Sequence, residues 1–200
     1  MKPIILFSTL WLLVNAPPIE TVNLQILHKD KMVGQFSAQR SKFGDLTVYQ
    51  SHSTVGSNKL RVQISYEIRV VLQKGVLQES DLTMTINGRL RTHSQTRKDG
   101  DIYTFYKNGK NIGEIQEEIT HTTIMLYFDE PIDIRKTYSE EQGNFCKILR
   151  HGSQTYQKIN SKGKINTYRY SANSLRYLLI KNNLIDFEMI SKTSDHQPEE

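Results

Sequence analysis

The chain has 200 residues, a formal net charge of +5 and one cysteine. This length allows a single hydrophobic core that buries about 70% of the unfolded surface, so neither a disulfide nor a metal is needed for stability. The basic residues are scattered among acidic ones and form no run that follows a phosphate backbone, so we expect no nucleic-acid partner. Cys146, the single cysteine, excludes an intrachain disulfide and a Cys-rich zinc site, and we expect a buried, inert thiol.

The N-terminal segment, residues 1–18, has the form of a secretory signal. Lys2 precedes an apolar run from Ile4 to Val14. The run has roughly 11 residues, fewer than the 17 to 25 of a membrane-spanning helix, so an anchor is the weaker alternative. Pro17 and Pro18 directly follow Ala16 and leave the cleavage site open. We therefore expect an exported protein, periplasmic or extracellular, with no transmembrane span after removal of the leader.

The mature chain begins with patterns typical of β-strands. Val22, Leu24 and Ile26 alternate with polar residues and lead through a turn into Met32–Arg40, which predicts a hairpin. A strand over 46–55 follows. The longest alternation runs from Leu60 to Gln73 and predicts a long strand with one buried face. Because such a strand would reach roughly 45 Å if straight, we expect it to bend across a curved sheet.

Four tight turns follow the long strand. They lie at Lys74-Gly75, Asn87-Gly88, Asp99-Gly100 and Asn108-Gly109. The last three are flanked by β-formers, and each suits a two-residue turn with positive φ at both central positions. The turns predict an antiparallel meander from about 60 to 115. The expected fold class is therefore all-β, an antiparallel meander that forms a barrel or half-barrel, in a single domain over 19–191.

Turn length fixes the register, so the faces of the meander can be assigned. One face would collect mainly uncharged residues: Val62, Ile64, Tyr66, Ile68, Val70, Leu77, Thr83, Thr85, Leu90, Thr92, Ser94, Thr96, Tyr103, Phe105 and Ile112. The opposite face would collect Arg61, Arg69, Arg89, Arg91, His93 and Arg97. This assignment places Glu79 and Asp81 inside but Leu82, Met84 and Ile86 outside; a bulge near 78–80 would move Leu82, Met84 and Ile86 inward.

The inner face combines small hydroxyl residues with large aromatic ones, which indicates a cavity. Alternatively, a helix or the far strands fill the same space. If a cavity exists, we expect an apolar or lipid-like ligand to contact Ile64, Tyr66, Tyr103, Phe105 and Tyr127.

The segment 116–131 has helical character. Thr120 or Thr122 can cap a short helix or turn near 120–130, and Pro131 ends it; we expect the segment over one end of the sheet. Strands then resume over 133–138, 144–149, 154–159, 165–170, 175–180 and 184–190. The polar tail at 192–200 is expected to be disordered.

Enzyme signatures are absent from the sequence, so we expect no catalytic residues, no cofactor, no metal site and no enzymatic activity. The best catalytic candidates are His121, Tyr127, Asp129 and Glu130. A simpler explanation is structural: the segment begins with a capped turn, packs apolar residues against the sheet and ends with solvent-exposed acidic residues before Pro131. Tyr168, Tyr170 and Tyr177 could line a ligand site, although cross-strand aromatic pairing is the commoner reason for such a pattern.

The ordered features resemble a family of uncharacterised exported proteins of Bacteroidota-type bacteria, classed as a domain of unknown function. The resemblance rests on the leader, Val33-Gly34, the segment 74–77, the Asn-Gly turns at 87 and 108, and Met125 to Pro131. It covers roughly 21–191. It implies an antiparallel barrel or half-barrel loosely similar to lipocalins and lipoprotein carriers, and it implies no activity.

Two functions remain in competition. The first is a cell-envelope binding module that holds an apolar ligand inside the sheet. The alternative is a structural or interaction protein of the envelope, with a solid sheet whose edge or arginine-bearing face meets a partner. An enzyme is the weakest possibility. The sequence defines no oligomeric state.

Overall fold

A computed structural model describes residues 18–57, 62–181 and 186–191. The expected leader, apart from Pro18, and the expected tail at 192–200 lie outside the described residues. The strands of the first half are β1 Ile19–His28, β2 Lys31–Phe43, β3 Leu46–Ser57, β4 Val62–Gln73, β5 Val76–Ile86, β6 Arg89–Asp99, β7 Ile102–Lys107 and β8 Lys110–Ile115. The second half contains the 3-10 helix η1 Thr123–Tyr127, then β9 Lys136–Ser139, β10 Asn144–Gly152, β11 Thr155–Ile159, β12 Ile165–Ser171, β13 Ser174–Ile180 and β14 Phe187–Ser191.

All described strands belong to one antiparallel sheet. The sheet runs in the order β8-β7-β6-β5-β4-β3-β2-β1-β14-β13-β12-β11-β10-β9, so each half is a meander and β1 joins the halves by pairing with β14. The all-β meander is confirmed. Because β8 and β9 end the order without pairing with each other, the sheet is open and corresponds to a half-barrel.

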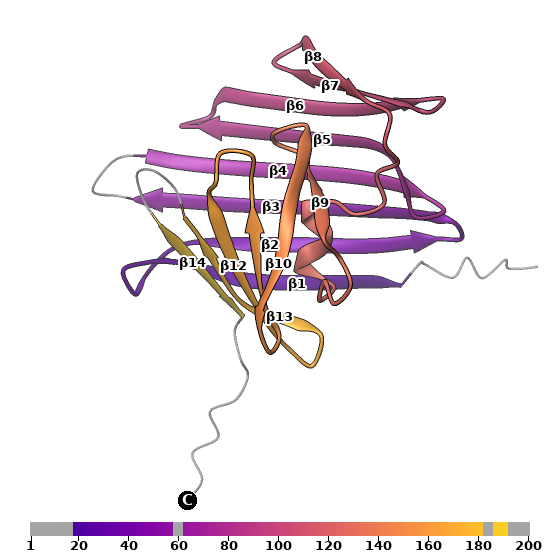
Figure 1. Cartoon of the computed structure of the whole chain (residues 1–200). Coiled ribbons are helices and arrows are strands. Elements are labelled where there is room, and N and C mark those ends of the chain that lie inside the picture. Colours follow the sequence, from indigo (N-terminus) through magenta and orange to yellow (C-terminus); the bar gives the residue numbers. More distant parts are fainter. Residues whose placement is uncertain (1–17, 58–61, 182–185, 192–200) are drawn as a thin grey trace, which may run out of the picture.

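The sheet folds into two layers. Figure 1 shows the long strands β1–β6 as a broad layer, with the shorter strands β10, β12 and β14 crossing in front of it. The corner lies where β14 pairs with β1, with Leu24 opposite Ser191 and Leu27 opposite Glu188. The inner faces of both layers therefore look into one shared space.

The register between β4 and β5 contains the bulge that the sequence offered as an alternative. Val71 pairs with Glu79 and Leu72 with Leu77, which leaves Gln78 as the extra residue. The bulge turns Leu82 inward, where it is 3% exposed, and sends Glu79 outward to form an ion pair with Arg69. Thr83 and Thr85 consequently face outward, contrary to the unbulged assignment.

Two more bulges correct the assignment for Leu90 and Ile112. Arg91 is the extra residue of β6, and Ile112 is the extra residue of β8. Leu90 is 60% exposed and Ile112 is 59% exposed. Neither residue belongs to the core, because each lies at a bulge near the margin of the sheet.

Two of the three turns that were predicted to have positive φ at both central positions have it, and so does Lys74-Gly75. Lys74-Gly75, Asn87-Gly88 and Asn108-Gly109 all have positive φ at both positions. The fourth differs, because Asp99 pairs with Ile102 and the central residues are Gly100 and Asp101. Only Gly100 has positive φ there, at 56°, which fits a turn with glycine at the first central position.

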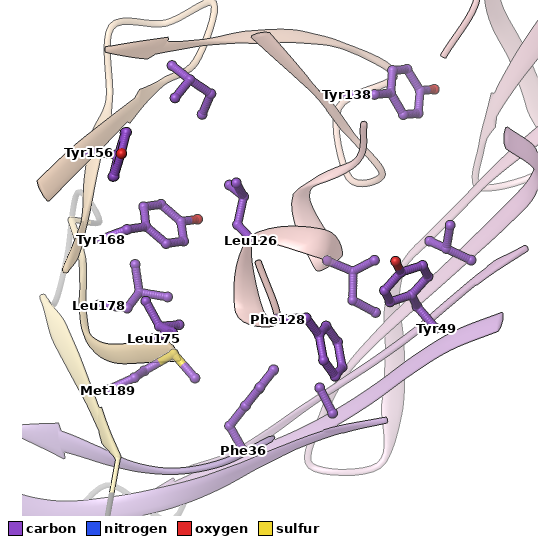
Figure 2. Close-up of a cluster of buried hydrophobic side chains, with 14 of the residues drawn as sticks. Phe36, Tyr49, Leu126, Phe128, Tyr138, Tyr156, Tyr168, Leu175, Leu178 and Met189 are labelled. Carbon is purple, nitrogen blue, oxygen red and sulfur yellow. The ribbon is translucent and has the colours of Figure 1, made fainter. Parts of the chain in front are cut away.

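The segment 119–128 lies between the two layers and not over one end of the sheet, which corrects the sequence expectation. η1 contacts β3 in the first layer and β9 and β13 in the second. Ile119 and Ile124 are fully buried, and each burial contributes about 1.5–3 kcal/mol. Figure 2 shows Leu126 and Phe128 extending from this segment among aromatic and aliphatic side chains of both layers. A chain segment thus fills much of the interior.

Candidate functional site

Ile64 and Tyr66 lie on the inner face of β4. Ile64 pairs with Val55 and Ile86, and Tyr66 pairs with Ser53 and Met84. All of these side chains are only partly buried, although they face inward. Burial and the charge of Glu141 raise the pKa of Tyr66 to about 12. This part of the inner face is less covered than the rest.

Tyr103 and Phe105 lie elsewhere on the same face. Phe105 belongs to a cross-strand row with Thr96, Ser80 and Val70. Val70 is four residues beyond Tyr66 on β4, a distance of about 13 Å along the strand. The structure therefore does not bring Phe105 and Tyr66 into the same part of the interior.

The chain itself covers Tyr103 and Phe105. Tyr103 is 1% exposed, and its hydroxyl oxygen accepts a hydrogen bond of 3.3 Å from the backbone N–H of Ile119. Phe105 lies directly against Gly143, where an added Cβ would be 2.2 Å from its ring. Both aromatics therefore serve packing.

Tyr127, at the end of η1, connects the two layers. Its ring centroid lies 4.3 Å from that of Phe36. Phe36 shares a cross-strand row with Ser53 and Tyr66, so the small Ser53 separates two large aromatic residues. Tyr127 thus packs against the cross-strand row that contains Tyr66.

The facing layer contributes polar groups to the same space. Lys158 of β11 pairs with Ile148 and Asn166, and Ile148 is buried. The ammonium group of Lys158 donates a hydrogen bond of 3.4 Å to Thr123 Oγ1 at the start of η1. Burial raises the pKa of Tyr127, and the neighbouring Tyr168, Lys158 and Glu140 modify it. An ammonium group and phenol groups therefore lie close together at one end of the interior.

Glu140 is a buried carboxylic acid at the end of β9. It is 2% exposed and accepts a hydrogen bond of 2.9 Å from the backbone N–H of Ile124. Burial raises the pKa of Glu140, and this hydrogen bond together with Lys158 opposes the rise. Nearby, burial also raises the pKa of the Cys146 thiol, which is 1% exposed, as expected for an inert thiol.

The alternative catalytic candidates do not form one hydrogen-bonded group among the described residues. Asp129 accepts a hydrogen bond of 2.5 Å from Arg40, and Glu130 accepts one of 2.8 Å from the Tyr156 hydroxyl. His121 Nδ1 lies 3.3 Å from the Thr120 hydroxyl, and burial lowers the pKa of His121. Each side chain thus has a separate partner that ties this segment together or to the sheet.

Sequence reasoning missed Lys158 and Glu140. The available signal was the alternation of Tyr156, Lys158 and Asn160 within a strand, which places a lysine on the same face as a buried tyrosine.

Of the other tyrosines, Tyr168 pairs with Tyr156 and Leu178, and Tyr170 donates a hydrogen bond of 2.7 Å to the Leu126 carbonyl.

The outer face of the first layer carries paired charges over a shallow depression of about 590 Å³. Glu79 pairs with Arg69 and Arg97, and the Asp81 carboxylate lies 3.2 Å from His93 Nε2. The bulge at Gln78 sends Glu79 and Asp81 to this face, beside the predicted Arg69, His93 and Arg97. Arg89, which was also predicted on this face, pairs instead with the inward-facing Ile86, and the predicted Arg61 lies outside the described residues.

These features define a class of protein, an open antiparallel half-barrel whose interior is partly filled by its own 3-10 segment. The chain belongs to the family described as a domain of unknown function, DUF6134, whose model matches residues 24–192. Searches of curated proteins and of solved structures returned no match. Within the described ranges, no helix has the length and apolar character to span a membrane.

Proposed function

We propose that this protein is an exported envelope protein that binds an apolar or amphipathic ligand between the two layers, without enzymatic activity. The observation that supports the proposal is uneven coverage of one apolar face. The segment 119–128 closes the inner face near Tyr103, and the turn at Gly143 closes it over Phe105. At the other end of the same strands, inward-facing apolar side chains stay partly exposed: Val55, Ile64, Tyr66, Met84 and Ile86.

The proposed ligand lies along this less covered region, against Ile64, Tyr66 and Tyr127. Apolar surface that remains in contact with water favours binding of an apolar molecule, at about 25 cal/mol per Å² removed from water. Tyr103 and Phe105, which the sequence placed in the same site, support the wall through packing. The comparison with lipocalins and lipoprotein carriers, and an origin in Bacteroidota-type bacteria, stay expectations from the sequence.

A fluorescent polyene fatty acid, cis-parinaric acid, tests the proposal by titration. Ile64→Glu places a charge in the proposed site, and Leu149→Glu is the matched control because Leu149 is 49% exposed and adjoins the inward-facing Ile148 on β10. We expect Ile64→Glu to weaken binding at least about tenfold and Leu149→Glu to leave it within about twofold. Equal effects of both variants, or no binding by the wild type, would refute the proposal.

Export requires its own test. Fractionation of cells that express the full chain, followed by N-terminal sequencing of the purified protein, is expected to find a shortened chain outside the cytoplasm. An intact N-terminus on cytoplasmic protein would contradict export.

A second function is favoured by the edge strand β8. Its residues from Lys110 to Glu114 are all exposed, and β8 pairs only with β7 in the sheet order of the described strands. An exposed edge can pair with a strand of another protein. A Gly113→Pro variant that lost a reproducible envelope partner, while keeping cis-parinaric acid binding, would favour this interaction role.

A further inference from the structure

We propose that the ligand has an anionic head group, a carboxylate or phosphate at the end of an acyl chain, and that Lys158 binds it. The inference rests on the proposed function, because it assigns the polar end of the same ligand. Four properties of the interior support it.

First, Lys158 faces inward from a strand with neighbours on both sides. β11 lies between β10 and β12, and Tyr156, two residues before Lys158 on the same face, is 1% exposed. The cross-strand neighbour Ile148 is 4% exposed. Lys158 itself is half-buried, so its ammonium group loses part of its hydration, a cost that a charged partner would offset.

Second, this charge is not held in an ion pair. The ammonium group donates a hydrogen bond of 3.4 Å to the neutral Thr123 hydroxyl, and the buried Glu140 is an electrostatic neighbour. Among the described residues, Lys158 takes part in none of the ion pairs. An incoming anion would supply the missing charge.

Third, the nearest acidic group is already engaged. Glu140 accepts the N–H of Ile124 at 2.9 Å and is 2% exposed. Because burial raises the pKa of Glu140, its neutral form is favoured relative to an exposed carboxyl group. It therefore opposes an anion beside Lys158 less than an ordinary carboxylate would.

Fourth, groups that can donate hydrogen bonds lie near Lys158. Tyr127 and Tyr168 are electrostatic neighbours of each other, and Lys158 is a neighbour of Tyr127. Asn166 lies opposite Lys158 in the β11–β12 ladder. Figure 2 shows the Tyr168 hydroxyl directed toward the interior, on the side of Leu126. Phenol and amide donors next to an ammonium group match the acceptor oxygens of a carboxylate or phosphate.

The apolar region and the charged end are connected by Tyr127. Its ring packs against Phe36, which shares a cross-strand row with Tyr66. A ligand whose chain follows Ile64 and Tyr66 therefore has its end near Tyr127 and Lys158.

The test measures the affinity of the full mature protein for hexadecanoate, hexadecanol and lysophosphatidylglycerol by displacement of cis-parinaric acid. Three variants are compared: Lys158→Gln, Lys158→Arg and, as a control, Lys147→Gln on the exposed face of β10. Thermal unfolding verifies that each variant is folded.

We expect the wild type to bind at least one of the two anionic amphiphiles about tenfold or more tightly than hexadecanol. Lys158→Gln is expected to remove that preference and to leave hexadecanol affinity within about twofold, while Lys158→Arg and Lys147→Gln retain the preference. A preference for hexadecanoate alone identifies a carboxylate head group, and one for the lysophospholipid alone identifies a phosphate.

Two results would overturn the inference in different ways. If the wild type bound hexadecanol as tightly as the anions, or if Lys158→Gln kept the preference, the head-group assignment would fail and the binding function would stand. If none of the three amphiphiles displaced the probe, or the probe itself did not bind, the function and the inference would fail together.

Discussion

Arg40 on β2 is predicted to be a major link between the first layer and the interior segment. Its guanidinium group donates hydrogen bonds to Glu20 at 2.9 Å and to Asp129 at 2.5 Å. The same group lies 5.2 Å from the ring of Phe128 and 6.0 Å from that of Tyr49. One side chain thus holds β1, β2, β3 and the end of the interior segment together.

The expected loss of stability depends on how exposed Arg40 and its acidic partners are. The Arg40 side chain is 15% exposed, but Glu20 and Asp129 are 50% and 53% exposed, so each ion pair contributes only about 0.2–1 kcal/mol. Each cation–π contact adds about 0.5–1 kcal/mol. Arg40→Met keeps most of the aliphatic stem and removes all four interactions, so we expect the free energy of unfolding to fall by about 2–3 kcal/mol.

Urea denaturation at equilibrium, followed by tyrosine fluorescence and circular dichroism, measures the change. Arg40→Lys keeps the charge and is expected to recover about half of the loss, because lysine lacks the planar fork. A double-mutant cycle with Asp129→Asn should give a coupling energy of about 0.5–1 kcal/mol that decreases in 1 M salt. A loss below about 0.5 kcal/mol for Arg40→Met would refute the assignment of Arg40 as a link.

Three further predictions concern the interior and the sheet. Because the folded state raises the pKa of Glu140, it binds the proton more tightly than the unfolded chain does; the contribution of Glu140 to stability should therefore be largest below the unfolded pKa of about 4.3 and decrease as pH rises toward the folded pKa. Glu140→Gln should remove this decrease in urea titrations from pH 4 to 8, and an unchanged pH profile would contradict the prediction. Tyr170→Phe leaves the buried Leu126 carbonyl without its 2.7 Å donor and should cost about 1–3 kcal/mol in the same assay; a neutral result would mean that water replaces the hydroxyl. Gly34→Ala would place a Cβ 2.0 Å from a backbone oxygen of β3 and should lower stability by about 1–3 kcal/mol, whereas Gly113→Ala, with open space around it, is the control that should change stability by less than about 0.5 kcal/mol.

The strands and turns of this fold could be predicted because their signals are local. Asn87-Gly88 and Asn108-Gly109 specify turns through backbone conformations that few residues adopt readily, and the alternation that includes 62–73 specifies a strand there. The bulge at Gln78 was foreseen as an alternative because acidic and aliphatic residues fell on the wrong faces without it. Local pattern and register together determine each half of the meander.

Long-range packing could not be predicted in the same way. Pairing of β1 with β14, and insertion of Ile119 and Ile124 between the layers, depend on how two curved surfaces fit together. The candidate site depends most on this long-range packing. Tyr66 and Phe105 share a face, as predicted, but only the tertiary packing shows that Phe105 is covered by the turn at Gly143 and that Tyr66 stays partly exposed. The proximity of Lys158 to Tyr127 likewise arises from that packing.

The junction of β1 with β14 has a consequence for how the chain folds. Among the described strands β1 is synthesised first and β14 last, so hairpins β1–β8 can form through local contacts while the junction forms only after β14 has been synthesised. Until then, β1 presents an open edge that can pair with other chains. A nascent or truncated chain without 187–191 is therefore the species most exposed to aggregation, and a chaperone that covers the edge of β1 would act where the folding pathway is slowest.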